Sequence, residues 1–336
     1  MKLRLRTRLS LRLERRGLQL RALAKSWELK PVTKRYGGLG PGPVLFSTMR
    51  NEAVRLPYFL DYYRRLGIVH FFVVDNGSDD GTPELLGAAS DVSVWRTEAR
   101  YKASRFGVDW LNRLLALHGS GRWVLVADPD EFLVYPYCDT RRLPALIRWL
   151  ESNKRQSFGT MLLDLYGQGT LAETTYRTGE DPVAAAPWFD ANNYWVERNE
   201  RYHNLWIQGG PRVRLSPGEA LGKAPALNKI PLVRWRRSYI YRNSTHDLLP
   251  RRLNRVYDHR GGARTSGILL HTKFLDVLTE KIDEEVVRAQ HYAGGREYRT
   301  LAATGEDTRL WTPQSTRYEG WEQLCDLGLM ARGGWF

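Results

Sequence analysis

Three carboxylates follow one apolar stretch within four residues: Asp128, Asp130 and Glu131 come directly after residues 123–127. Carboxylates held this close repel one another, which raises their pKa values and lowers stability unless a cation offsets the charge. Hard oxygen ligands of this kind suit Mg²⁺ or Mn²⁺, ions that commonly bridge a protein to the phosphates of its substrate. The cluster therefore predicts a divalent cation, and a solvated acidic turn is the alternative.

A second polar segment has the sequence DNGSDDGT at residues 75–82 and follows another apolar run. Its glycines permit tight turns, and its Asp, Asn and Ser side chains supply hydrogen-bond acceptors. Asp75 is therefore a candidate for accepting a hydrogen bond from a base or a ribose. The alternative is an Asx-rich turn that caps the next helix.

The segment TMRNE at residues 48–52 follows the first apolar strand, with Thr48 at the strand end. Asn51 is the expected N-cap of the next helix, because a side-chain acceptor there satisfies free backbone N–H groups. Glu52 would then lie in the first helical turn, near the sheet edge, where it can hold a ribose hydroxyl.

Histidines and basic residues supply the remaining candidate groups. His271 follows the apolar run at 266–270, and a neutral imidazole there would be the third protein ligand of the cation. His246 is the alternative ligand. Arg212 and Lys229 belong to a second basic group, which predicts binding of a diphosphate or an acidic acceptor, with solvated surface as the alternative.

Hydrophobic periodicity indicates the scaffold that positions these residues, because from residue 44 short apolar runs alternate with helical spacing. Strands are expected at 44–49, 68–74, 92–95, 123–127, 157–165 and 266–270, and helices at 51–66, 83–88, 106–117 and 276–292. This order predicts an α/β fold, a doubly wound, mostly parallel sheet with helices on both faces. Ligands of such sheets bind at the carboxyl ends of the strands, where Asp75 and Asp128 lie.

Net charge and composition limit the function classes. The 336-residue chain carries a formal charge of +14, with 42% apolar and 26% charged residues, which is typical of a globular protein. Residues 1–40 hold 12 Lys or Arg against two Glu, a local +10, which leaves +4 for the other 296 residues. This asymmetry argues against a nucleic-acid partner. Two cysteines make no disulfide framework, which favours a cytoplasmic protein.

The basic N-terminal segment has helical periodicity. Six apolar residues form one stripe, which Arg8, Arg12 and Arg15 flank and Arg16 interrupts. The stripe comprises Leu5, Leu9, Leu13, Leu20, Leu23 and Trp27. Peripheral contact of residues 1–35 with anionic lipid, at the inner membrane face, is one interpretation. A helix packed on its own domain, a solvated tail and a strand are the alternatives. No apolar run is long enough to span a membrane.

The segments TMRNEA, DNGSDDGT and RWVLVADPDEFLVYP together resemble a GT-A glycosyltransferase of the family 2 type, and more narrowly the bacterial subgroup with a DEF-type metal motif. GGPR, KIPLVRW, STHDLL and LLHTKFL are also similar to that subgroup, and the resemblance covers about residues 44–300. It implies a nucleotide-sugar donor, with a UDP-sugar expected, and Mn²⁺ or Mg²⁺. Asp128 and Asp130 would form the DxD motif, with His271 as the late metal ligand.

The resemblance also implies the donor contacts and the acceptor. The candidate nucleotide-sugar contacts are Thr48, Asn51, Glu52, Asp75, Asn76, Ser78, Asp128 and Arg212. The acceptor would be a glycan or a lipid-linked molecule, as in cell-surface polysaccharide assembly, and transfer would invert the anomeric carbon. The acceptor motif in which family 2 enzymes keep their base is absent here, so Asp164 and Asp190 are the candidate bases.

Breaker residues and the resemblance together divide the chain. The cluster GGLGPGP at 37–43 ends a basic N-terminal arm at 1–43. A GT-A domain is expected at 44–275, with a nucleotide-binding half at 44–160 and an acceptor half at 161–275. A helical C-terminal extension at 276–336 would pack on this domain.

Two other function classes compete with glycosyl transfer. A nucleotidyltransferase on a related α/β fold would also need acidic metal ligands, but the segment STMRNEA after the first strand lacks the glycines of a phosphate loop. A non-enzymatic basic binder of membranes or nucleic acid would spread its charge over a folded face.

Overall fold

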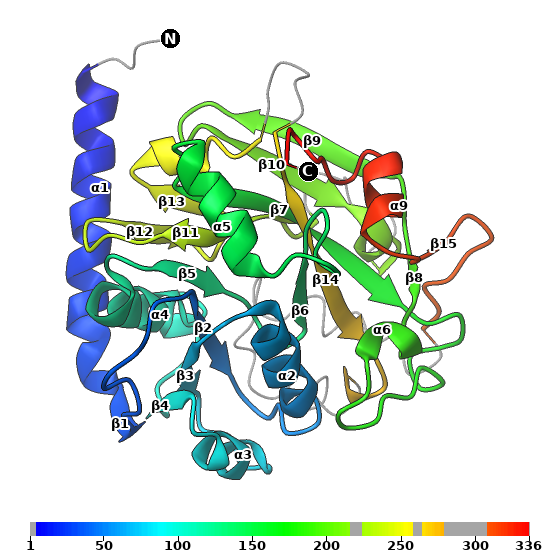
Figure 1. Ribbon diagram of the computed structural model, residues 1–336, viewed down its shortest axis with the longest axis horizontal. Coiled ribbons are helices and arrows are strands. Elements are labelled where there is room, and N and C mark those ends of the chain that lie inside the picture. Colours follow the sequence, from blue (N-terminus) through cyan, green and yellow to red (C-terminus); the bar gives the residue numbers. More distant parts are fainter. Residues whose placement is uncertain (1–4, 216–223, 258–263, 279–307, 336) are drawn as a thin grey trace.

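A mixed β-sheet forms the centre of the molecule (Figure 1). The computed structural model describes residues 5–215, 224–257, 264–278 and 308–335. The strand order along the sheet is β1-β4-β3-β2-β5-β11-β7-β14-β6, and β8 and β15 extend it from β7. The strands β2, β3, β4 and β5 pair parallel to one another, and β7 pairs parallel to β14. The predicted α/β sheet is confirmed.

The strand bounds are β1 (Lys30–Thr33), β2 (Val44–Met49), β3 (His70–Asp75), β4 (Val92–Arg96), β5 (Trp123–Val126), β6 (Glu131–Val134), β7 (Ser157–Tyr166), β8 (Trp188–Phe189), β11 (Asn228–Arg234), β14 (Gly267–Phe274) and β15 (Thr316–Arg317). Two hairpins lie outside the sheet: β9 (Tyr194–Asn199) with β10 (Asn204–Gly209), and β12 (Ile240–Asn243) with β13 (Asp247–Leu249). The helices are α1 (Leu5–Ala24), α2 (Leu56–Leu66), α3 (Thr82–Ala88), α4 (Val108–Leu114), α5 (Leu143–Ser152), α6 (Pro182–Ala185) and α9 (Trp321–Asp326).

Helices cover both faces of the sheet. Successive strand residues point in opposite directions, so neighbouring residues of one strand belong to different buried clusters. Leu45 and Leu125 belong to one buried cluster, which also holds apolar residues of α2, α3 and α5. Phe46 and Val126, one position further along, belong to a second cluster with residues of α4. Both faces are thus buried, which explains the continuous apolar runs of β2, β3 and β5.

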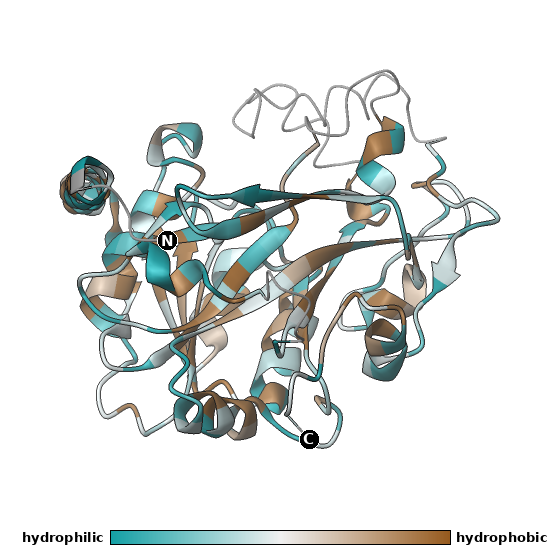
Figure 2. Ribbon diagram, turned by 90° about the horizontal axis from the view of Figure 1, so that it is seen from above, coloured by the Kyte–Doolittle hydropathy of each residue, from teal (hydrophilic) through white to brown (hydrophobic). Residues whose placement is uncertain are grey.

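The basic N-terminal segment packs on the domain. The helix α1 contacts the rest of the protein through Leu11, Leu18 and Ala22, which lie against Ile240 and Leu249 of the β12-β13 hairpin. The strand β1, which follows α1 in the chain, pairs antiparallel with β4 at the edge of the sheet. The segment therefore forms a helix packed on its own domain, which was one of the predicted alternatives. The domain boundary at residue 43 stays a prediction. Figure 2 looks along α1, which lies at the margin of the molecule.

Most of the predicted helix at 276–292 lies outside the described residues. The described part of the C-terminal extension contains β15 and α9, and Trp321 and Leu324 of α9 pack into the first buried cluster. No helix within the described ranges is long and apolar enough to cross a membrane.

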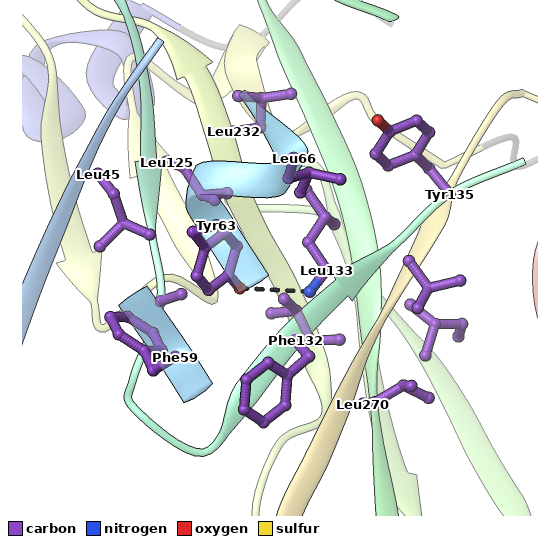
Figure 3. Packing of buried hydrophobic residues seen from close by; sticks show 14 of the residues in the cluster. Leu45, Phe59, Tyr63, Leu66, Leu125, Phe132, Leu133, Tyr135, Leu232 and Leu270 are labelled. Atoms are coloured by element: carbon purple, nitrogen blue, oxygen red, sulfur yellow. Dashed lines mark hydrogen bonds between the residues drawn. The ribbon is translucent and has the colours of Figure 1, made fainter. Parts of the chain in front are cut away.

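Tyrosines of α2 cover the free edge of β6, the last strand of the sheet path. The hydroxyl of Tyr63 donates to the carbonyl of Glu131 at 2.7 Å and accepts from the backbone N–H of Leu133 at 3.2 Å (Figure 3). Tyr62 donates to the carbonyl of Leu133 at 2.7 Å. These bonds satisfy backbone groups that an edge strand would otherwise expose, and they hold the strand that follows the acidic turn.

We predict that Tyr63→Phe lowers the free energy of unfolding by about 1–3 kcal/mol, because two buried backbone groups lose their partner. Urea denaturation followed by circular dichroism measures this change. Tyr36→Phe is the matched control: Tyr36 is half-buried, its hydroxyl makes no hydrogen bond within the described residues, and we expect a change below about 0.5 kcal/mol. Equal losses in both variants would contradict the role of the Tyr63 hydroxyl.

Candidate functional site

Three candidate side chains lie at one edge of the parallel part of the sheet. Thr48 is next to last in β2, Asp75 is last in β3, and Asp128 lies two positions after the end of β5. Because these strands are parallel neighbours in the order β3-β2-β5, their carboxyl ends meet at this edge. The structure therefore brings the residues of the three predicted polar segments to one place.

A cavity lies between the end of β2 and the acidic turn. Its lining includes Thr48, Tyr101, Phe106, Asp128, Glu131, Lys229, Tyr241 and Thr245. The buried hydroxyl oxygens of Thr48 and Thr245 have no hydrogen-bond partner within the described residues. Because an unpaired buried hydroxyl costs free energy, this wall is suited to a polar ligand.

Asp75 and Asn76 fix the loop after β3, and both are buried. Oδ1 of Asp75 accepts hydrogen bonds from the backbone N–H and the hydroxyl of Ser78, at 3.0 and 2.5 Å. Asn76 donates to the carbonyls of Thr97 and Ala99 at 3.1 Å. The Asx-rich turn is therefore present, and Oδ2 is the Asp75 atom that stays without a partner among the described residues.

Asn51 and Glu52 do not begin a helix, so the N-cap prediction for Asn51 is wrong. The helix α2 starts at Leu56, and Asn51 has a φ of 50° in the left-handed region. Asn51 instead exchanges two hydrogen bonds with Asp79 and so joins the loops after β2 and β3. Glu52 is buried before the helix, with Oε2 3.3 Å from Nη1 of Arg55. The side chain of Asn51 is thus engaged by Asp79 and does not cap a helix.

A buried lysine balances part of the acidic turn between β5 and β6. Lys229 donates to Oε1 of Glu131 at 2.8 Å, and Oε2 of Glu131 accepts from the backbone N–H of Asp128 at 3.3 Å. Burial and the Glu131 carboxylate raise the pKa of Asp128 to about 7. Burial lowers the pKa of Lys229, but Glu131 and Asp128 outweigh it and raise that pKa overall. One ammonium group thus faces more than one carboxylate.

The ring of His271 is held between two carboxylates. Its Nδ1 lies 2.5 Å from Oδ1 of Asp164, and its Nε2 lies 3.2 Å from Oδ2 of Asp130. Two acceptors would repel at 2.5 Å, so Nδ1 carries a proton and donates it to Asp164. Burial lowers the pKa of His271, but Asp130 and Asp164 outweigh burial and raise it to about 9. The structure therefore brings together His271 and Asp130, two of the three residues predicted as metal ligands.

Both candidate bases are engaged with arginines. Arg212 binds Asp164 with two hydrogen bonds of 2.7 Å, and His271 supplies a third donor. Burial would raise the pKa of Asp164, but Arg212 and His271 hold it well below its usual range. Asp190 accepts from Arg214 at 2.5 and 2.9 Å and also from the hydroxyl of Tyr166. Asp164, whose pKa is lowered in this way, is a weak proton acceptor.

The alternative ligand His246 lies in the turn between β12 and β13. Its Nδ1 is 2.7 Å from the carbonyl oxygen of Asn228, and burial lowers the pKa of its ring to about 3. Within the described residues, no carboxylate forms an ion pair with His246. The histidine that contacts Asp130 is therefore His271.

The donor set of the acidic turn fits a cation such as Mn²⁺ or Mg²⁺. A ring nitrogen of His271 faces Asp130 while the other ring nitrogen is held by a carboxylate, which is the usual environment of a metal-binding histidine. Asp128 lies in the same turn, and its pKa is raised by burial and by the neighbouring Glu131 carboxylate, whose charge a cation would offset. No three His, Cys, Asp or Glu side chains of the described residues form a metal-binding cluster. Substrate phosphates and water commonly complete such sites.

Two features of this site have no local signal in the sequence. Lys229, grouped above with phosphate-binding cations, is buried against Glu131. Asp164 lies opposite His271 because β7 and β14 pair parallel in that register, although the two residues are 107 positions apart. Only the pairing of distant strands reveals these partners.

Comparison with known proteins gives one sequence relative and several structural similarities. No protein-family model matches the chain. The chain is 28% identical over 136 residues to a glycosyltransferase family 92 protein from Oryza sativa subsp. japonica, and the match covers 38% of this chain and 22% of the rice protein.

Two solved structures are similar to parts of the fold. One is a mannosyltransferase from Pyrobaculum calidifontis in complex with GDP-Man and Mn²⁺, with 20% identity, 46% of each chain covered and a TM-score of 0.28. The other is a 4-diphosphocytidyl-2C-methyl-D-erythritol synthase, with 18% identity, 40% of this chain and 64% of that chain covered and a TM-score of 0.25. At these TM-scores, neither similarity carries an argument about function.

We predict that Asp128→Asn raises stability at neutral pH when a chelator is present. The folded-state pKa of about 7 exceeds the usual aspartate value, so ionising Asp128 destabilises the folded protein as the pH rises from about 4 to about 7. Because the side chain is partly exposed, we expect a gain of about 1–3 kcal/mol at pH 7.5 that vanishes near pH 4.

Urea denaturation at several pH values measures this gain. Asp61→Asn is the control, since Asp61 is an exposed partner of Arg65 on α2, and its change should stay below about 0.5 kcal/mol at every pH. An Asp128→Asn variant that is less stable at pH 7.5 and equally so at pH 4 would contradict the electrostatic account.

Proposed function

We propose that the protein is a glycosyltransferase that moves a sugar from a nucleotide-sugar donor to a hydroxyl acceptor. The observation that carries this proposal is the placement of His271 against Asp130, in the acidic turn at the sheet edge where Asp75 also lies. The similarity to the family 92 glycosyltransferase supports glycosyl transfer. The motif resemblance to family 2 enzymes is a finer assignment that we propose on the motifs alone.

The proposed donor site combines Asp75, at the end of β3, with the cavity between β2 and the acidic turn. Oδ2 of Asp75 is suited to accept from the base or ribose, and the hydroxyl of Thr48 is suited to a polar group of the nucleotide. Asp128 and Asp130 would hold Mn²⁺ or Mg²⁺ together with His271. When bound, such a cation offsets the charge of the leaving diphosphate. Lys229 keeps Glu131 in place and limits the repulsion within the turn.

We assign Asp164 a positioning role rather than the role of a base. Its carboxylate fixes the Nδ1–H tautomer of His271 and so directs Nε2 towards Asp130. Arg212 in turn fixes Asp164, so this arginine acts on the site through two side chains rather than on the diphosphate directly. We assign Asp190 a positioning role as well, because it pairs with Arg214 and so holds the segment around residue 190 beside β7.

We predict that Asp130→Ala and His271→Ala each lower kcat/KM for donor turnover by at least about 100-fold, because both remove a ligand of the proposed cation. The assay measures release of nucleoside diphosphate from UDP- and GDP-sugars with Mn²⁺. Asp61→Ala serves as the control and should keep wild-type turnover, since Asp61 is exposed on α2. Unchanged turnover in Asp130→Ala would contradict the proposal. Release of sugar 1-phosphate instead of nucleoside diphosphate would indicate nucleotidyl transfer.

We predict that Asp164→Asn weakens Mn²⁺ binding by about 10–100-fold, because the partner that orients a metal-binding histidine is changed. Titration of Mn²⁺ followed by electron paramagnetic resonance measures the affinity, and a thermal melt confirms that the variant folds. At saturating Mn²⁺, kcat should recover to within about tenfold of the wild type. A kcat that stays low at saturating Mn²⁺ with unchanged Mn²⁺ affinity would make Asp164 the base instead.

A further inference from the structure

The outer face of α1 is a stripe of exposed leucines. Leu9, Leu13, Leu20 and Leu23 are 56, 58, 66 and 51% exposed, and Trp27 in the turn after the helix is 78% exposed. At 100° per residue, the four leucines lie within about 80° of the helix surface. Apolar side chains gathered on one face in this way mark an interaction surface, whereas single exposed leucines do not.

This exposure is not the result of a loosely attached helix. The opposite face is bound to the protein through Leu11, Leu18 and Ala22, which pack against the β12-β13 hairpin. The one acidic residue of α1, Glu14, also faces inward and accepts from the hydroxyl of Tyr202 at 3.0 Å. The helix therefore has two apolar faces, of which the protein covers one.

Cations border the leucine stripe. The helix contains six arginines and one glutamate. Arg8 and Arg12 are exposed beside the leucines, Arg16 is exposed within their stripe, and no ion pair joins these arginines to a carboxylate of the described residues. Arg21, by contrast, pairs with Asp109 of α4 at 2.7 Å and anchors the helix. The outer surface of α1 thus combines apolar side chains with uncompensated positive charge.

These properties favour an anionic lipid surface as the partner. A bilayer interface takes up leucine and tryptophan side chains at the headgroup boundary and attracts arginines to its phosphates. A second copy of the chain would bring two arginine-rich helices together, which like-charge repulsion opposes. Nucleic acid would match the arginines but would leave the leucines in water. The helix spans about 30 Å and lies at the margin of the molecule, where a flat surface can reach it (Figures 1 and 2).

We propose that the outer face of α1 docks on an anionic lipid bilayer, with Leu9, Leu13, Leu20, Leu23 and Trp27 inserted at the interface and Arg8, Arg12 and Arg16 on lipid phosphates. The helix then lies in the plane of the interface while its inner face stays on the protein. This docking does not depend on the proposed glycosyl transfer, because the residues involved lie outside the candidate site.

Vesicle flotation with the full chain tests the proposal. We expect the protein to float with phosphatidylcholine vesicles that contain about 30% phosphatidylglycerol, to stay behind with pure phosphatidylcholine, and to lose binding as salt rises from about 0.1 to about 0.5 M. Leu13→Gln/Leu20→Gln should weaken partitioning by at least about tenfold. Arg12→Gln/Arg16→Gln should weaken it by a similar factor, since each arginine contributes about fivefold.

The double variant Leu85→Gln/Leu327→Gln is the matched control, because both leucines are exposed, at 38 and 42%, on other parts of the protein. It should bind vesicles as the wild type does, and thermal melts establish that all variants fold. Two results of the vesicle experiment would overturn the proposal: no binding of the wild type to anionic vesicles, or equal binding after Leu13→Gln/Leu20→Gln. A dimer in solution that Leu13→Gln/Leu20→Gln dissociates would also overturn it in favour of a second copy.

Discussion

The candidate site depends on one buried imidazole that touches two carboxylates. His271 would lose charge on burial, yet Asp130 and Asp164 on either side of it raise its pKa to about 9. This contact requires two strand pairings at once. The strand β14 runs parallel to β7 with His271 opposite Asp164, and antiparallel to β6 with His271 opposite Glu131. A shift of one residue in either register would turn the imidazole away from one carboxylate.

The charges around this imidazole are distributed in a way that links stability to function. Two deeply buried carboxylates are paired with cations: Glu131 with Lys229, and Asp164 with Arg212. Asp128 and Asp130 lie in the same turn, and burial together with the Glu131 carboxylate raises the pKa of Asp128 to about 7. An arrangement optimised for stability alone would not keep these carboxylates together. Their cost in stability is the physical reason to expect a cationic or phosphate-bearing ligand at this edge.

Sequence patterns predicted the first half of the fold well, because its signals are local. The apolar runs of β2, β3 and β5 and the turn sequences after them correspond closely to the observed elements, and Asp75 and Asp128 lie at the strand ends as expected. The prediction for Asn51 was wrong, because its partner Asp79 lies in a different loop and no local pattern reveals it.

The second half of the site could not be read from local patterns. The role of Asp164 follows from the pairing of β7 with β14, and the burial of Lys229 follows from the position of β11 between β5 and β7. Periodicity also could not tell which face of α1 the protein covers. Leu11 and Leu13 lie on opposite faces of the helix, and only packing decides that the first is buried and the second exposed.

We infer that Asp130 and His271 hold a divalent cation against the diphosphate of a nucleotide sugar at the sheet edge near Asp75. A crystal structure with Mn²⁺ and a nucleoside diphosphate, with data collected at the manganese absorption edge, tests it most directly. We predict an anomalous peak in contact with Asp130, Nε2 of His271 and the diphosphate, with the nucleoside beside Asp75. A bound nucleotide whose manganese peak lies away from Asp130 and His271 would contradict the account.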